Sequence, residues 1–563
     1  MSETVDAQAG ASRSDLPTLE GPSAWDWDRA IGGQLQGPLE AALARQIVTR
    51  RWFGAKARTI RGVKIVEAIA ITADTRLLLL EIEFTTGPSE VYQVPLGYVA
   101  SDRAEQVVAA NADQAWARVR IAGSREAALL IDPLIDADFC RSLLAIVGSQ
   151  APLPGLRGEI SAWQSAAFHT LADQPEEHLS PSLIDAEQSN SSVAFGERLI
   201  LKLYRRLESG SNPDVEIAAY LTERGFSHTA ALAGTIEYRR ANELPWTLAA
   251  LQAFVPNQGD AWRHMLARMD EFLARTIPLQ DEPGQQAELP GDRLQQAARR
   301  PIPPLAWQLL GRSLNDAELL GTRTAEMHLA LAVETDNPDF APEPFSKVDQ
   351  SRWCNDASAL SAETFALLRK QLPGLNAAVG EVAARVLALE PARNEQLRRT
   401  ATEPIHAAKI RCHGDYHLGQ VLVAGDDFVI IDFEGEPSRP LAQRRQKLLA
   451  LRDLAGMIRS FHYAACSGAA SAIAQSLGDG DRIQRLAQEW YQWMSAGFLG
   501  AYLRATEGAV FLPRSDDEFD RLLDACLLEK AVYELRYELN NRPDWVYLPL
   551  GALVDLLEAK QQP

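Results

Sequence analysis

Short apolar or alternating segments dominate the first half of the chain. Between about 60 and 136 they read VKIVEAIAI, RLLLLEIEF, VYQVPLGYV and EAALLIDPL, each bounded by Gly, Pro, Thr or Ser. Runs of this kind predict strands and hairpins. A second group of strand-like runs covers 183–205, and WTLAALQAFVP at 246–256 is the last strand candidate. Helical periodicity is found at 24–46 and again at 214–224.

The second half of the chain is helical in period. Apolar residues recur every three or four positions, which predicts helices, over 261–276, 305–335, 357–372, 376–389, 442–466, 481–505 and 516–540. Two segments interrupt this pattern. Residues 277–304 are rich in Pro, Gln and Gly and predict an exposed insertion, whereas 410–433 contains the strand-like runs VLVAG and FVIIDF. We therefore predict an α+β fold with a ligand cleft between its halves.

Composition narrows the class of protein. A chain of 563 residues holds roughly three to five structural units, and 46% apolar with 23% charged residues excludes a disordered, collagen-like or coiled-coil chain. The net charge of −19 argues against nucleic acid or anionic lipid as a partner. The chain has no apolar run of membrane-spanning length and no signal-peptide pattern at its start, and its five cysteines are scattered. We expect a cytoplasmic protein with reduced thiols and a flexible tail at 1–23.

The strongest chemical signal is HGDYHLGQ at 413–420, followed by a short hairpin pattern and by IDFE ending at 434. Asp415 and Asp432 stand at the two ends of this hairpin, so both can face one site. Kinase catalytic loops place a base Asp, an amide side chain five residues later and then an Asp-Phe pair. Asp415, Gln420 and Asp432 fit this spacing. We therefore predict phosphoryl transfer, with Asp415 as the base.

These motifs resemble the maltokinase family of the aminoglycoside-phosphotransferase-like kinases. RWFGAK at 51–56, YQVPL at 92–96 and YELRYELNNRPDW at 533–545 resemble further signatures of that family, which also occurs as the maltokinase domain of trehalose synthase fusions. The resemblance implies a bilobal eukaryotic-protein-kinase-like fold with an extra strand-rich N-terminal cap and a helical C-terminal lobe. The expected divisions are a tail at 1–23, the cap at 24–140, the N-lobe at 141–256, and the C-lobe at 257–563 with its catalytic hairpin at 410–436.

A kinase also needs a cation on the ATP phosphates. Lys202 lies in an apolar strand and Glu216 begins the next helical stretch. Since a buried lysine needs a partner, we predict that these two pair. The preceding polar loop, from Gln188 onward, is either a phosphate cover or an ordinary hairpin loop. The residues expected near the nucleotide are Ser189, Asn190, Ser191 and Ser192 of this loop and, from the hinge position that the resemblance implies, Gln252, Phe254 and Val255.

The remaining predictions concern the metal and the sugar. We expect Mg²⁺ at Gln420, Asp432 and Glu434, and we expect His413 to have a structural hydrogen-bonding role. Sugars are bound by planar polar groups and aromatic faces, although an amphipathic helix that packs in the core gives a similar pattern. The candidate sugar contacts are His417, Tyr533, Glu534, Tyr537, Asn540, Arg542 and Trp545.

The resemblance implies ATP-dependent phosphorylation of maltose at its anomeric hydroxyl, giving maltose 1-phosphate and ADP. Two alternatives remain open. One is another sugar kinase of the same scaffold, such as a glucosamine kinase. The other is a non-catalytic partner that docks on trehalose synthase, against which the complete set of Lys202, Asp415, Gln420 and Asp432 argues.

Overall fold

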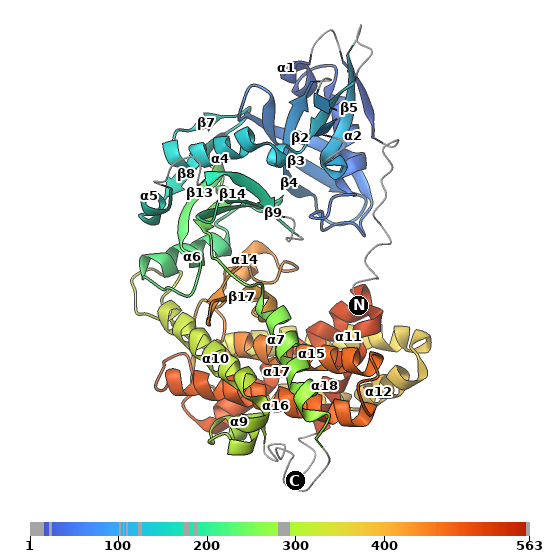
Figure 1. Cartoon of the computed structure of the whole chain (residues 1–563), viewed down its shortest axis with the longest axis vertical. Helices are drawn as coiled ribbons and strands as arrows, with labels where there is room; N and C mark the ends of the chain where they lie inside the picture. Colours follow the sequence, from blue (N-terminus) through green and yellow to red (C-terminus); the bar gives the residue numbers. More distant parts are fainter. Residues whose placement is uncertain are drawn as a thin grey trace. The chain divides into compact units, whose positions relative to one another are not determined.

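The computed structural model describes residues 16–21, 25–100, 103–104, 106–107, 111–121, 127–172, 179–184, 189–279 and 293–558. The chain forms two compact units. The first comprises 1–219 with 230–256, and the second comprises 220–229 with 257–563. Figure 1 shows their elements, with the strands of the first unit in blue to green and the helices of the second in green to red.

The cap of the first unit is a mixed sheet of order β1-β5-β6-β4-β3-β2, with β12 also paired to β4. Its strands are β1 (Thr18–Gly21), β2 (Ile60–Ala70), β3 (Thr75–Phe84), β4 (Glu90–Val99), β5 (Ala115–Ile121), β6 (Ala127–Ile131) and β12 (Arg206–Leu207). β1 pairs in parallel with β5, and Leu19 is buried. The prediction of a flexible tail is therefore wrong for Thr18–Gly21, because this segment completes the sheet and its apolar side chain joins the core. Residues 1–15 and 22–23 of that tail lie outside the described residues.

The four consecutive leucines of β3 follow from burial on both faces of this sheet. Leu78 and Leu80 pack with α1 (Trp27–Ile31) and α2 (Gln36–Ile47) in one core. Leu77 and Leu79 point to the opposite face, as alternation requires, and join the core that holds α4 (Ala137–Ser149) and the second sheet.

The cap cluster at 51–56 is part of this first core. Trp52 and Phe53 lie against Tyr92, with ring centroids 6.1 and 5.2 Å apart. The cation over Trp52 is the Arg205 guanidinium at 4.7 Å, whereas Arg51 and Lys56 are exposed. The aromatic residues of this motif therefore pack in the cap.

The second sheet of the first unit has the order β7-β8-β13-β14-β11-β10-β9. Its strands are β7 (Leu153–Pro154), β8 (Glu159–Gln164), β9 (Pro181–Ile184), β10 (Ser191–Phe195), β11 (Leu199–Leu203), β13 (Leu232–Arg239) and β14 (Trp246–Ala253), and α5 (Ala167–Ala172) follows β8. Gln93 of the cap joins the two sheets, since its buried amide donates to the carbonyls of Tyr204 (2.7 Å) and Leu248 (2.5 Å). A buried ion pair between Arg205 and Asp132 at 2.6 Å adds to this connection.

The second unit is mostly helical. Its helices are α7 (Ala261–Thr276), α8 (Leu294–Ala298), α9 (Pro304–Leu310), α10 (Arg312–Leu331), α11 (Lys347–Gln371), α12 (Ala377–Ala388), α13 (Glu390–Thr402), α14 (Leu441–Arg444), α15 (Leu451–Ala474), α16 (Gly480–Ala505), α17 (Asp516–Asn541) and α18 (Tyr547–Glu558). α6 (Pro213–Glu223) crosses the division between the units. Two short antiparallel strand pairs complete the unit. β15 (Glu343–Pro344) pairs with β16 (Ala408–Lys409), which is distant in sequence, and β17 (Val421–Ala424) forms a hairpin with β18 (Asp427–Ile430).

The predicted exposed insertion at 277–304 requires a correction. Its central part, 280–292, lies outside the described residues, but α8 within it is packed rather than exposed. The buried Gln295 amide donates to Asp524 at 2.7 Å, and Ala297 and Ala298 are buried. Within the described residues, no helix is both long and apolar enough to cross a membrane.

Candidate active site

A short hairpin brings the two ends of the catalytic motif together, as predicted. β17 and β18 pair antiparallel with Val421 opposite Ile430. The ladder continues one step further, because the Ile431 amide donates to the Gln420 carbonyl at 3.0 Å. The turn is at Gly425, whose φ of +65° suits glycine. Asp415 therefore lies before one strand of the hairpin, and Asp432 directly follows the other.

His413 has the structural role that was predicted. Its Nε2 lies 2.9 Å from the carbonyl oxygen of Ile431, which can only accept, so Nε2 carries the proton. Nδ1 is then the acceptor for the backbone N–H of Asp415, at 3.4 Å. His413 thus ties the loop that carries Asp415 to the strand end that precedes Asp432.

The buried carboxylate of Asp453, at the start of α15, binds the backbone of the loop that carries Asp415. It accepts hydrogen bonds from the backbone N–H groups of His413 (2.8 Å) and Gly414 (3.0 Å). His328 of α10 contacts the same carboxylate at 3.1 Å. Burial raises the pKa of Asp453. The hydrogen bond and the charge of His328, together with the hydrogen bond from the Gly414 amide, lower it by more, so the pKa lies below its usual value. Asp453 therefore acts as an ionised anchor for the loop.

The loop also lies directly on α15. A Cβ at Gly456 would collide with the carbonyl oxygen of Tyr416, so only glycine permits this close approach. The Tyr416 side chain is buried, and its hydroxyl shares a hydrogen bond with Thr324 of α10 at 2.9 Å. The backbone around Asp415 is thus fixed by α10 and α15.

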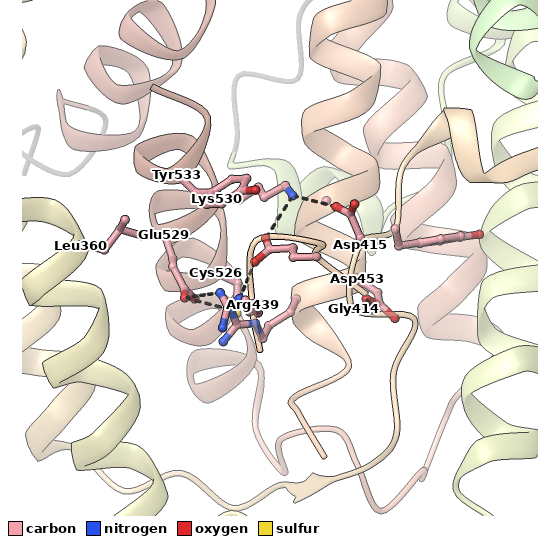
Figure 2. A pocket seen from close by; sticks show the side chains of 13 residues that line it. Leu360, Gly414, Asp415, Arg439, Asp453, Cys526, Glu529, Lys530 and Tyr533 are labelled. Atoms are coloured by element: carbon pink, nitrogen blue, oxygen red, sulfur yellow. Dashed lines mark hydrogen bonds and ion pairs between the residues drawn. The ribbon is translucent and has the colours of Figure 1, made fainter. Parts of the chain in front are cut away.

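Asp415 lines a pocket between this loop and the polar face of α17 (Figure 2). Lys530 of α17 lies between two carboxylates, with Nζ 3.5 Å from Asp415 and 3.7 Å from Glu436. Burial lowers the pKa of Lys530, but the charges of Asp415, Glu436 and Glu534 raise it well above its usual value. Lys530 and Glu436 were not predicted from the sequence. The available signal was a charged pair, Glu529-Lys530, inside an otherwise apolar run of α17.

His417 lies close to both aspartates of the motif. Burial is the main cause that lowers the pKa of His417, Lys530 lowers it further, and the charges of Asp415 and Asp432 act in the opposite direction. Its Nδ1 accepts from the Gly419 backbone N–H at 3.1 Å and caps a 3₁₀ turn. His417 is therefore neutral near pH 7, and its contact with a sugar stays a prediction.

The expected metal ligands offer a suitable set of donors. Carboxylate oxygens of Asp432 and Glu434 lie within 4.8 Å of each other, and the Gln420 backbone is bonded to the strand end before Asp432. Asp432 has a φ of +68°, a left-handed conformation that aspartate adopts more readily than most residues other than glycine, but still at some cost. Such strain is concentrated at functional sites, and oxygen donors are those that Mg²⁺ prefers.

Among the predicted sugar residues, Tyr533 is the one that lines the Asp415 pocket. Its ring centroid lies 5.0 Å from the Lys530 ammonium. Glu534 lies beside it and is held by Arg459 of α15 at 2.8 Å. Arg459 itself is buried, so it is the ion-pair partner of this acid and not a surface charge on the helix.

The other predicted sugar residues lie further along α17 and beyond its end. Trp545 stacks on Tyr463 of α15, with ring centroids 6.3 Å apart and planes 17° apart. The Arg542 guanidinium lies 5.3 Å from the Tyr537 ring and 4.9 Å from the Trp545 ring. Asn540 is exposed and donates to the Arg536 carbonyl of its own helix. These residues form an aromatic and cationic group whose role in sugar binding stays a prediction.

Among the residues predicted to bind the nucleotide, Lys202 of β11, in the first unit, has an acidic partner. Its Nζ lies 3.0 Å from the buried carboxylate of Asp214, which also accepts from the Tyr204 hydroxyl at 2.8 Å. Asp214 was not predicted. It stands in the first turn of α6, two residues before Glu216, and the pairing of Lys202 with Glu216 stays a prediction.

The predicted phosphate loop and hinge flank β11. Ser192 pairs with Lys202 across β10 and β11, Ser191 accepts a hydrogen bond from Arg205 at 2.8 Å, Asn190 is buried and Ser189 is exposed. Gln188, with which the predicted loop began, lies outside the described residues.

In the hinge, Gln252 pairs with Ile200 of β11. The Phe254 amide donates to the Arg198 carbonyl at 2.9 Å. An adenine contact through the backbone of Phe254 would therefore use its carbonyl, and a contact with Val255 stays a prediction.

Comparison with known proteins identifies a matching family model and relatives of this chain. Residues 47–123 match the maltokinase N-terminal cap domain. The glucosamine kinase of Mycolicibacterium smegmatis is 27% identical over 384 residues, which cover 67% of this chain and 79% of the relative. The glucosamine kinase of Streptacidiphilus jiangxiensis is 28% identical over 382 residues, covering 66% and 73%.

Solved structures share the fold. A glucosamine kinase in complex with glucosamine, ADP and inorganic phosphate is 20% identical, with a TM-score of 0.54, over 92% of this chain and 99% of that one. A further crystal form of glucosamine kinase is 21% identical with a TM-score of 0.56. These findings confirm the kinase-like α+β fold with its cap and the predicted resemblance to the maltokinase family, and they assign the chain to the phosphotransferases.

Proposed function

We propose that this chain, which carries a maltokinase N-terminal cap on a kinase-like fold, phosphorylates maltose at the anomeric hydroxyl with ATP. The observation that carries the phosphotransferase assignment is Asp415, held by His413 and Asp453 at the edge of a pocket that α17 also lines. The match of 47–123 to the maltokinase cap supports maltose as the sugar.

Asp415 would accept the proton of the attacking hydroxyl, because a carboxylate positioned by a fixed loop can act as a general base. An anomeric hydroxyl is more acidic than other sugar hydroxyls, so a carboxylate is a sufficient base. Gln420, Asp432 and Glu434 would hold Mg²⁺, which neutralises charge on the transferred phosphoryl group when it is bound. Lys202, fixed by Asp214 at 3.0 Å, would bind the nucleotide phosphates.

A second candidate function is phosphorylation of glucosamine, which the names of the relatives favour. Both candidates place the chain in sugar metabolism. For maltose, this would be metabolism linked to trehalose and α-glucans, in the cytoplasm, with trehalose synthase as a docking partner.

The test is ADP release by the purified chain across maltose, glucose and glucosamine, with Asp415→Asn as the control. The proposal predicts the highest kcat/KM for maltose and a kcat that is roughly 10²–10⁴-fold lower in the variant. A higher kcat/KM for glucosamine than for maltose would select the second candidate, and an Asp415→Asn variant that keeps more than a tenth of the wild-type kcat would refute the assigned base.

A further inference from the structure

The pocket at Asp415 contains a cation that the phosphoryl-transfer assignment leaves unexplained. Lys530 stands on α17 with its side chain 20% exposed, and Nζ lies 3.5 Å from Asp415 and 3.7 Å from Glu436 (Figure 2). Both distances exceed the 2.7–3.2 Å of an ordinary N–H···O hydrogen bond. The ammonium is therefore attracted to both carboxylates without a short hydrogen bond to either.

Each carboxylate that lines this pocket has a basic partner. Asp415 has Lys530, and Glu436 has Arg439 as well as Lys530. The other two lining acids are also paired, Glu529 with Arg452 at 2.9 Å and Asp453 with His328 at 3.1 Å. A second ammonium entering the pocket would have to compete for carboxylates that already have partners.

We infer that Lys530 is a specificity residue that makes this acceptor site select neutral sugars over aminosugars. The inference rests on the proposed sugar-kinase function and names the substrate class. A sugar hydroxyl that approaches Asp415 can accept a hydrogen bond from the Lys530 ammonium. A protonated aminosugar instead brings a like charge close to it, which disfavours the bound state.

The groups around Lys530 keep its side chain protonated. The titratable groups facing it are Asp415 and His417 of the loop, Glu436, and Tyr533 and Glu534 of its own helix. The acids among them raise the pKa of Lys530 despite burial, and His417 is neutral near pH 7. The repulsion is therefore present throughout the neutral range.

The test compares glucose with glucosamine, which differ in one hydroxyl and one amine. In the wild-type chain we expect kcat/KM to be higher for glucose. Lys530→Met should shift the ratio toward glucosamine by roughly 10–100-fold, the effect of removing one close like charge, whereas Lys530→Arg should keep the wild-type preference. Lys409→Met is the matched control, because it removes a different lysine–aspartate pair of 2.9 Å, with Asp349, outside this pocket. It should leave the ratio unchanged.

A second measurement needs no variant. In the wild-type chain, kcat/KM for glucosamine relative to glucose should rise with pH as the sugar amine loses its proton. A ratio that is independent of pH, a wild-type preference for glucosamine at neutral pH, or an unchanged ratio in a folded Lys530→Met would each overturn the inference. If glucose is a substrate and maltose is not, the maltose assignment fails while the selection of neutral sugars stands. Absence of ADP release with every sugar would overturn both.

Discussion

Asp453→Asn should both destabilise the second unit and slow the reaction. The carboxylate is 2% exposed and accepts from two backbone N–H groups of the catalytic loop, at 2.8 and 3.0 Å. Hydrogen bonds to a charged group contribute about 1.5–3 kcal/mol each, and removing one partner of a buried ion pair, here Asp453 with His328 at 3.1 Å, costs about 3–5 kcal/mol. An asparagine keeps the shape but presents one amide N–H₂ group, which cannot accept from the loop.

We therefore expect the free energy of unfolding to fall by about 3–5 kcal/mol and kcat to fall by roughly 10²-fold, the cost of misplacing a catalytic group by about 1 Å. Chemical unfolding and steady-state kinetics measure the two effects. Asp316→Asn is the matched control, because Asp316 also joins a histidine, His264 at 2.8 Å, but stands away from the loop with 19% of its side chain exposed. It should cost roughly 0.5–2 kcal/mol and leave kcat unchanged.

The direction in which the free energy of unfolding changes with pH follows from the lowered pKa of Asp453. A carboxylate whose pKa is lower in the folded state stabilises that state above its unfolded pKa of about 3.9. This contribution to stability is lost as the pH falls through the pKa of the carboxylate in the folded state. The stability difference between wild type and Asp453→Asn should therefore be constant near neutral pH and shrink below about pH 4. An Asp453→Asn variant with wild-type stability and wild-type kcat would refute the anchoring role.

Four further variants test other parts of the site. Asp415→Asn should lower kcat by roughly 10²–10⁴-fold, as removal of a general base does, with nucleotide binding retained, and more than a tenth of the wild-type kcat would contradict its role. Asp432→Ala should abolish Mg²⁺-dependent ATP binding in calorimetry, while Glu434→Gln should only raise the Mg²⁺ requirement; unchanged affinity in the former would exclude Asp432 as a ligand. Trp545→Ala should lower kcat/KM for maltose by roughly 10–200-fold at an unchanged melting temperature, with the exposed Trp163→Ala as control. A lower melting temperature instead would make Trp545 a structural residue.

Local hydrophobic patterns were sufficient to predict elements in which the buried residues recur with the period of that element. α7 spans Ala261–Thr276, the range that periodicity predicts, and Asp260 caps it by accepting from the Arg263 backbone N–H. The strands β5, β8 and β13 were not predicted from the sequence. β13, LAGTIEYR, shows no clean alternation because nearly all of its residues are buried, and sheet contacts rather than local pattern decide such strands.

The residues of the candidate site also divide into those that local sequence predicts and those that it does not. Asp415, Gln420 and Asp432 were predictable because one short hairpin holds them, so their spacing in sequence fixes their spacing in the fold. Lys530 and Asp453 were not, since each reaches the loop from a helix distant in sequence, and only the packing of α15 and α17 places them there. Asp214 was missed for a smaller reason, because two acids stand in the first turn of α6 and only Glu216 was predicted as a partner of Lys202.

The measurement that tests the central claim most directly is phosphorus NMR of the product formed from maltose and ATP. The account predicts a single new phosphate ester on the anomeric carbon, formed in equal amount with ADP, and formed at least about 10²-fold more slowly by Asp415→Asn. An ester at another position of maltose, or no ester from maltose alongside one from glucosamine, would contradict it.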